Sequence, residues 1–150
     1  MKIRTDYVTN SSSSSFILGF KNEEEIENVV KQLPYYWSEE VKDNIISEIK
    51  HEVTSKEYAI EYYLDSCYGW GDGFQGKDYW DLTREDRQSS AYKEYVQDRK
   101  NKEAEELMKE LCDKEIISIV SYSDHDRLGS ELEHDIIPYL DNTIKRISHH

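Results

Sequence analysis

Residues 115–122 read Glu-Ile-Ile-Ser-Ile-Val-Ser-Tyr, and they form the clearest strand signal in the chain. Four branched apolar residues (Ile116, Ile117, Ile119 and Val120) are bunched rather than strictly alternating. Bunching of this kind is typical of a central strand covered on both faces. We therefore expect Ile117 and Ile119 to lie in the core of a sheet.

Other segments supply candidate partner strands. Residues 16–20 (Phe-Ile-Leu-Gly-Phe) predict a strand, and the five serines at 11–15 before it are interpreted as a turn or a solvated strand entry. Ile144 and Ile147 indicate a last strand near the carboxyl end. Residues 58–64 alternate between two sets of side chains, which favours a strand, although a helix is possible.

Helix-capping patterns mark the predicted helices. Asn22 followed by Glu25 predicts the start of one helix, and Ser38 the start of a second. We expect these two to form an αα-hairpin on one side of the sheet. Thr83 opens a long helical stretch reaching about Leu111, whose apolar positions lapse between residues 97 and 102, so that it either projects into solvent or breaks into two helices.

A second capping box near the carboxyl end, Ser130 with Glu133, predicts a short helix limited by Pro138. No repeat, linker or domain boundary is visible, so residues 1–150 are expected to form a single domain. The predicted fold class is α+β, with a small, mainly antiparallel sheet covered on one face by three or four helices.

The charge balance limits the kinds of partner. The 150 residues include 19 Lys and Arg against 32 Asp and Glu, a net charge of −13. Direct binding of nucleic acid or anionic lipid needs a basic footprint and is not expected. A partner with a basic surface is compatible with this charge. No apolar run approaches membrane-spanning length and no signal peptide is apparent, so a cytoplasmic location is expected.

Two segments resemble a known group. Residues 2–10 (Lys-Ile-Arg-Thr-Asp-Tyr-Val-Thr-Asn), with the five serines and Phe16, resemble an amino-terminal signature of uncharacterised bacterial and phage proteins. Residues 122–150, ending in Arg-Ile-Ser-His-His, are similar to the closing segment of some of them. The resemblance covers about the first 18 and last 30 residues and implies no activity. It does imply that the two terminal histidines are native rather than the remnant of a tag.

Histidines and acids gather near the carboxyl end. Four of the five histidines lie in the last 26 residues, among several carboxylates. Imidazole and carboxylate ligands suit zinc, manganese or iron. The candidate ligands are His125, Asp126, His134, His149 and His150, and Glu131 lies three residues before His134, on the same face of a predicted helix. The alternative is an exposed polar loop, a solvated helix face and a frayed terminus.

A second candidate site is an aromatic loop. Four of the six glycines lie within residues 69–76, where Trp70, Asp72 and Phe74 are the expected partner-binding residues. The first functional hypothesis is thus a small acidic binding or inhibitor protein, of phage type, that engages a basic macromolecule. The alternative is a metal-dependent hydrolase acting on phosphoesters, for which only Arg127, Lys145 and Arg146 are available as nearby cations.

Overall fold

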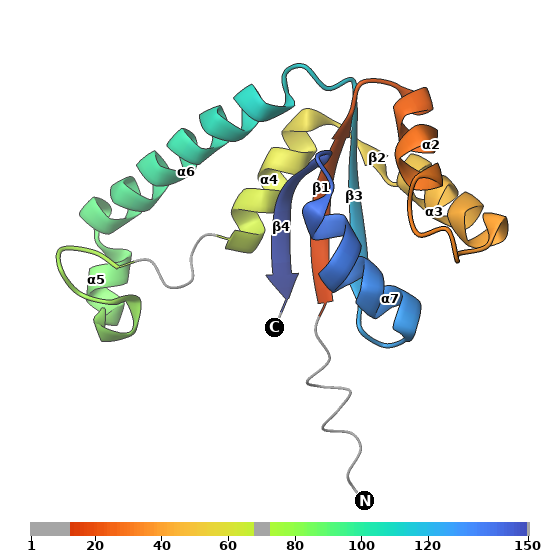
Figure 1. Cartoon of the computed structure of the whole chain (residues 1–150). Coiled ribbons are helices and arrows are strands. Elements are labelled where there is room, and N and C mark those ends of the chain that lie inside the picture. Colours follow the sequence, from red (N-terminus) through yellow and green to blue (C-terminus); the bar gives the residue numbers. More distant parts are fainter. Residues whose placement is uncertain (1–12, 68–72, 150) are drawn as a thin grey trace, which may run out of the picture.

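The computed structural model describes residues 13–67 and 73–149 and has an α+β fold (Figure 1). The strands are β1 (Ser13–Phe20), β2 (Val53–Thr54), β3 (Ile116–Ser123) and β4 (Thr143–His149). The α-helices are α2 (Glu23–Lys31), α3 (Glu39–His51), α4 (Lys56–Cys67), α5 (Arg84–Gln88), α6 (Ser90–Leu111) and α7 (Arg127–Glu131). A 3-10 turn (Tyr79–Asp81) precedes α5, and a π-helical turn (Leu132–Ile136) and a 3-10 turn (Ile137–Tyr139) follow α7. These elements confirm the predicted fold class.

The four strands form one antiparallel sheet in the order β2-β3-β1-β4. β1 pairs with β3 along its whole length, from Ser13 opposite Ser123 to Phe20 opposite Ile116. Its other edge pairs with β4, with a shift of register between Ile17 and Leu18. The beginning of β1 therefore lies beside the ends of both β3 and β4.

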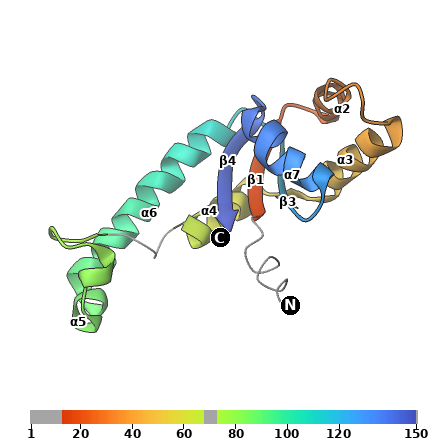
Figure 2. The ribbon, with the colours of Figure 1, turned by 60° about the horizontal axis from the view of Figure 1, so that its bottom comes forward.

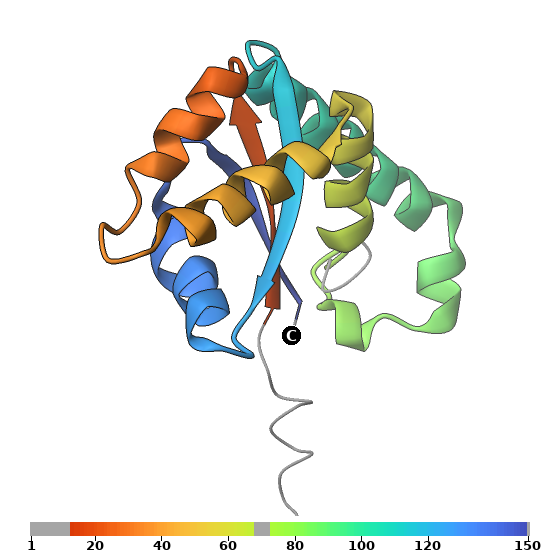
Figure 3. The same ribbon diagram turned by 90° about the vertical axis from the view of Figure 1, so that its right-hand side faces the viewer.

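Helices cover both faces of the sheet, where the sequence suggested one. On the first face, Phe16, Leu18 and Phe20 pack beneath α2 and α3, together with residues of the turns after α7. On the second face, Ile17, Ile117 and Ile147 pack against α4 and α6. Figure 1 shows these two groups of helices on opposite sides of the strands, and Figure 3 shows α3 crossing β3.

The central strand is mostly as predicted. Ile117 is buried, but Ile119 is only partly buried, because it lies at the margin of the second core beside a shallow cavity. Of the five serines, Ser11 and Ser12 lie outside the described residues, and Ser14 and Ser15 are buried strand residues rather than a turn or a solvated entry. Ser15 Oγ lies 2.9 Å from Tyr62 Oη and 2.7 Å from Ser121 Oγ, so its hydroxyl is satisfied across the second face.

Residues 58–64 are helical, within α4, so the strand favoured from their alternation is wrong. Apart from Glu61 the segment is apolar or aromatic on both alternating sets of positions, and the helix packs Ala59 and Ile60 against the sheet. Alternation over so few residues therefore did not distinguish the two structures. No helix within the described residues has the length and apolar character needed to cross a membrane.

The capping predictions were partly right. The side chains of Asn22, Ser38 and Thr83 each accept a hydrogen bond from the backbone N–H three residues later, as expected. The long helical stretch breaks at Ser89, which ends α5 and caps α6, rather than between residues 97 and 102. The Ser130 capping box is wrong, because Asp126 caps the helix there, four residues earlier.

Candidate metal centre

One end of the sheet carries a cluster of polar side chains. It is the end where β1 begins and where β3 and β4 finish, and Figure 2 brings it forward together with α7. The apolar half of β1 lies at the other end beneath α2 and α3. Ser14 is on the same face as Phe16, so its hydroxyl points toward the turns that follow α7.

The π-helical turn Leu132–Ile136 brings Glu133 and His134 to this end. Its i→i+5 geometry separates consecutive residues by a smaller rotation than an α-helix does, and such turns recur at functional sites. The smaller rotation allows adjacent side chains to approach one point. His134 Nε2 lies 3.4 Å from Glu133 Oε1, while Leu132 and Ile137 are held in the core.

The Glu133 carboxylate is completely buried, with 0% of the side chain exposed. It accepts a hydrogen bond from Ser14 Oγ at 3.1 Å, and Arg146 Nη2 lies 3.8 Å away. Arg146 also donates from Nε to Ser14 Oγ at 3.2 Å and lies over the Phe16 ring. A charge buried this deeply requires paired and hydrogen-bonded neighbours, and β1 and β4 provide them.

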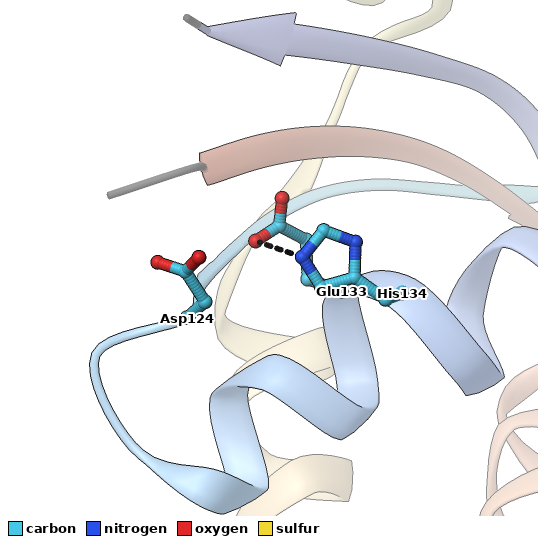
Figure 4. A group of neighbouring side chains, drawn as sticks. All are labelled: Asp124, Glu133 and His134. Atoms are coloured by element: carbon cyan, nitrogen blue, oxygen red, sulfur yellow. Dashed lines mark ion pairs between the residues drawn. The ribbon is translucent and has the colours of Figure 1, made fainter. Parts of the chain in front are cut away.

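Asp124 completes the cluster from the loop after β3, as Figure 4 shows. One potential ligand atom from each of Asp124, Glu133 and His134 lies within 4.8 Å of the other two. Ligand oxygens and nitrogens lie about 2.0–2.2 Å from a zinc ion, so two of them are at most ~4.4 Å apart. Small side-chain rotations would therefore bring all three into coordination distance.

This donor set has a defined chemistry. Two carboxylates and one imidazole suit zinc, manganese or iron, as expected from the residue types. Three protein ligands leave a coordination position for water or substrate, which is the pattern of catalytic rather than structural zinc sites. Two carboxylate charges would balance a divalent ion, and Arg146 adds a positive charge beside it.

Of the predicted ligands, the described cluster contains only His134. His125 is exposed in the loop, and Asp126 is engaged as the cap of α7, where its carboxylate accepts from Gly129 N at 2.6 Å. His149 pairs through its backbone with Ser13, and its side chain and His150 lie outside the described residues. Glu131 accepts from Tyr36 Oη instead, since the π-helical turn separates it from the face of His134.

The sequence reasoning missed Asp124 and Glu133 as candidate ligands and Ser14 as the hydrogen-bond donor to Glu133. Ser14 is 119 residues from Glu133, so no local pattern connects the two. One signal was present in the sequence: Glu133 lies between Leu132 and the pair Ile136-Ile137. A carboxylate among core residues indicates either a paired charge or a site.

The aromatic loop lies largely outside the described residues, which include neither Trp70 nor Asp72. Phe74 is half-buried, and its ring packs against Tyr92 and Tyr95 of α6 at centroid distances of 5.4 and 5.2 Å. A tight turn over Gln75 and Gly76, both with positive φ, returns the chain to pair Lys77 with Phe74. Phe74 thus contributes to packing on α6.

Comparison of the chain with protein-family models, with curated proteins and with solved structures finds no match.

Proposed function

We propose that this protein is a divalent-metal-dependent hydrolase of the phosphoester class, with its metal held by Asp124, Glu133 and His134. The observation that carries the proposal is the convergence of three donor atoms within 4.8 Å around a completely buried glutamate. Carboxylates and an imidazole are the ligand types that zinc, manganese and iron take in proteins. The metal, when bound, would polarise a phosphoryl oxygen and lower the pKa of a bound water to about 7.

The residues around the cluster have distinct roles in this proposal. Ser14 orients the Glu133 carboxylate through its hydrogen bond, as outer-sphere groups do for metal ligands. Arg146 is 36% exposed, so its guanidinium is accessible both to Glu133 and to an anionic group arriving from solvent. Guanidinium is the side chain best shaped for bidentate contact with phosphate. Arg146 therefore supports an anionic substrate.

The other two cations lie elsewhere. Lys145 points to the second face, where its Nζ lies 5.5 Å from the Tyr63 ring centroid and 3.8 Å from Glu110 Oε1. Arg127 lines a shallow cavity with Glu131 and Asp135. Among the three cations considered from the sequence, only Arg146 contacts the cluster.

Metal binding is the first test, by isothermal titration of the full chain with Mn²⁺ and Zn²⁺. Wild type should bind one ion, and Asp124→Asn and His134→Gln should each weaken binding at least tenfold, because each removes one ligand. His51→Gln is the matched control, since His51 Nδ1 lies 3.2 Å from Glu52 Oε1 in an exposed pair away from the site. The proposal fails if wild type binds no ion, or if the control weakens binding equally.

Hydrolysis is the second test, with bis(4-nitrophenyl) phosphate as substrate in the presence of the metal that binds. Activity should require the metal. Arg146→Gln should raise the KM for the substrate by a larger factor than it changes the Kd for the metal. Hydrolysis that persists unchanged in Asp124→Asn would exclude this cluster as the source. If the protein binds one metal ion but hydrolyses no substrate, the hydrolase proposal is wrong and only metal binding remains.

A second candidate function is binding of a basic macromolecule. Its support is the net charge of −13 together with exposed aromatic side chains in the α2–α3 loop, where Tyr35 is 93% exposed and stacks edge-on with Tyr36. Aromatic anchors with surrounding charge are typical of interaction surfaces. In this candidate function the aromatic anchors are the tyrosines of the α2–α3 loop rather than the predicted Phe74, because Phe74 packs on α6.

The test is affinity capture followed by identification of the retained proteins. We expect a basic protein to be retained, to be lost as salt rises, and to be lost in Tyr35→Ala. Trp80→Ala is the control, because Trp80 is also highly exposed but precedes α5, far along the chain from the loop. Retention that is indifferent to both salt and Tyr35→Ala would refute this candidate.

A further inference from the structure

A cavity of about 320 Å³ lies between α3, the end of β3 and α7. Its apolar walls include Val41, Ile45, Leu128 and Leu132, all of which belong to or pack against the first core. Its polar lining includes Tyr122, Glu48 and Asp126. A volume of this size suits a small ligand or a single long side chain.

The hydroxyl of Tyr122 is the unusual feature of this cavity. The oxygen is buried and makes no hydrogen bond of normal distance and angle, although the Glu48 carboxylate lies close to it. Burial raises the pKa of this phenol well above its usual value, and the negative charge of Glu48 and its polar contact with the hydroxyl raise the pKa further. The phenol therefore stays protonated, able both to donate and to accept. A buried hydroxyl left unsatisfied costs about 1–3 kcal/mol, and a ligand that completes its hydrogen bonding would recover part of that cost.

The charged residues that line the cavity determine which charge of ligand it favours. Glu48 is exposed at the rim, and Asp126 adds a second negative charge at the start of α7, where one of its carboxylate oxygens accepts from Gly129 N. No lysine or arginine lines the cavity among the residues that the structure describes. Two negative charges facing one partly apolar space favour a cation with an apolar stem.

We propose that this cavity binds the guanidinium group of an arginine side chain presented by a basic polypeptide. The guanidinium donates in a fixed fork, which can reach the Glu48 carboxylate and the Tyr122 hydroxyl together. Its methylene stem packs along Val41 and Leu128. Guanidinium is also less strongly hydrated than ammonium, so a partly apolar cavity favours arginine over lysine.

The inference deepens the second candidate function, on which its choice of a polypeptide source rests, and it does not depend on the metal cluster. It specifies the group of the partner that is recognised: an arginine side chain, rather than positive charge spread over the partner's surface. The α2–α3 loop and α7 are joined by the hydrogen bond from Tyr36 Oη to Glu131. A polypeptide seated on Tyr35 and Tyr36 therefore has a route toward α7, where the cavity lies.

The experiment is a titration of the full chain with acetyl-Gly-Arg-Gly-amide, followed by backbone amide NMR. Saturable shifts are expected at Asn44, Glu48 and Gly129, all of which line the cavity. The citrulline analogue has the same shape without the charge and should bind at least tenfold more weakly. Agmatine, a free guanidinium, should bind more weakly than the peptide; tighter binding of agmatine would overturn the polypeptide source.

Variants locate the binding. Glu48→Gln should weaken peptide binding at least tenfold, and Tyr122→Phe should weaken it several-fold. Asp43→Asn is the matched control, since Asp43 is an exposed acid on the same helix that does not line the cavity. Equal effects of Glu48→Gln and Asp43→Asn, or no saturable shift in wild type, would overturn the inference. Capture of a basic protein that survives Glu48→Gln would leave the second candidate function intact while refuting this site.

Discussion

Replacing Arg146 by glutamine tests how the buried glutamate is stabilised. The change removes the cation at 3.8 Å from Glu133 and leaves the carboxylate fully buried, with the Ser14 hydroxyl and the His134 ring as its remaining partners. Removing one partner of a buried ion pair costs about 3–5 kcal/mol. Arg146 is itself 36% exposed, so the pair is partly screened and we expect a loss of about 2 kcal/mol.

The neighbouring residue provides an internal control. Lys145 Nζ lies 3.8 Å from Glu110 Oε1, the same separation as in the Arg146 pair, but Glu110 is 45% exposed. Lys145→Gln should therefore cost no more than about 0.5 kcal/mol, since exposed ion pairs contribute little. Two substitutions to glutamine at adjacent positions of β4 then differ mainly in the burial of the acidic partner.

Equilibrium unfolding in urea, followed by circular dichroism, measures both losses. For a chain of this length, about 2 kcal/mol corresponds to a fall in Tm of roughly 4–8 °C. The double variant Arg146→Gln with Glu133→Gln should recover part of the loss, because no charge is then buried, and the double-mutant cycle gives the coupling between the two side chains. The reasoning is refuted if Arg146→Gln costs no more than Lys145→Gln, or if the double variant is as unstable as the sum of the singles.

Three further predictions concern single positions. Gly129→Ala should lower the free energy of unfolding in urea by about 3 kcal/mol, since its new Cβ would lie 2.2 Å from the Ser123 carbonyl oxygen. Gly19→Ala is the comparison: its nearest contacts would be atoms of the flexible Lys114 side chain, and the loss should be under about 1 kcal/mol. Tyr122→Phe should leave Tm unchanged or raise it by an amount equivalent to about 1 kcal/mol, because the lost hydroxyl makes no hydrogen bond of normal geometry; a clear fall in Tm would show that its contact with Glu48 is a stabilising hydrogen bond. The pKa of Asp86 is held below 3.8, first by the hydrogen bond from the Thr83 backbone N–H and then by the Thr83 side chain and Lys77. Because the charged carboxylate is the form that these contacts stabilise, α5 should lose stability as pH falls below that value. An NMR titration of the Asp86 carboxyl with a midpoint at or above 3.8 would contradict this.

Local patterns predicted local structure well. Asn22, Ser38 and Thr83 each cap a helix where one was expected to begin, because the bond joins residues three apart in sequence, although the helix that Thr83 caps ends at Gln88. The second half of the predicted capping box, a bond from the Asn22 backbone N–H to Glu25, is replaced. The Glu25 carboxylate accepts from Asn142 Nδ2 instead, 117 residues away. Tertiary contacts thus replace half of the predicted box.

The candidate site was predicted only in part, for the same reason. His134 was found because histidines and acids cluster in the sequence near it, but composition did not distinguish Asp124 from His125 and Asp126. That choice depends on which residue follows the last paired position of β3 and which one caps α7. The π-helical turn, which brings Glu133 beside His134, was indicated by no sequence periodicity either.

The register of β1 determines which serine faces the buried Glu133 carboxylate. Ser14 shares a face with Phe16, Leu18 and Phe20, so burying those three apolar side chains beneath α2 and α3 also directs the Ser14 hydroxyl toward Glu133. A slip of one residue would send Ser15 there instead and expose the apolar set to the wrong helices. The pairing that satisfies the core is therefore the pairing that satisfies the buried carboxylate. Because the core fixes this register, Glu133 and its partner Ser14 are held by core packing, whereas Asp124 joins them from the loop after β3.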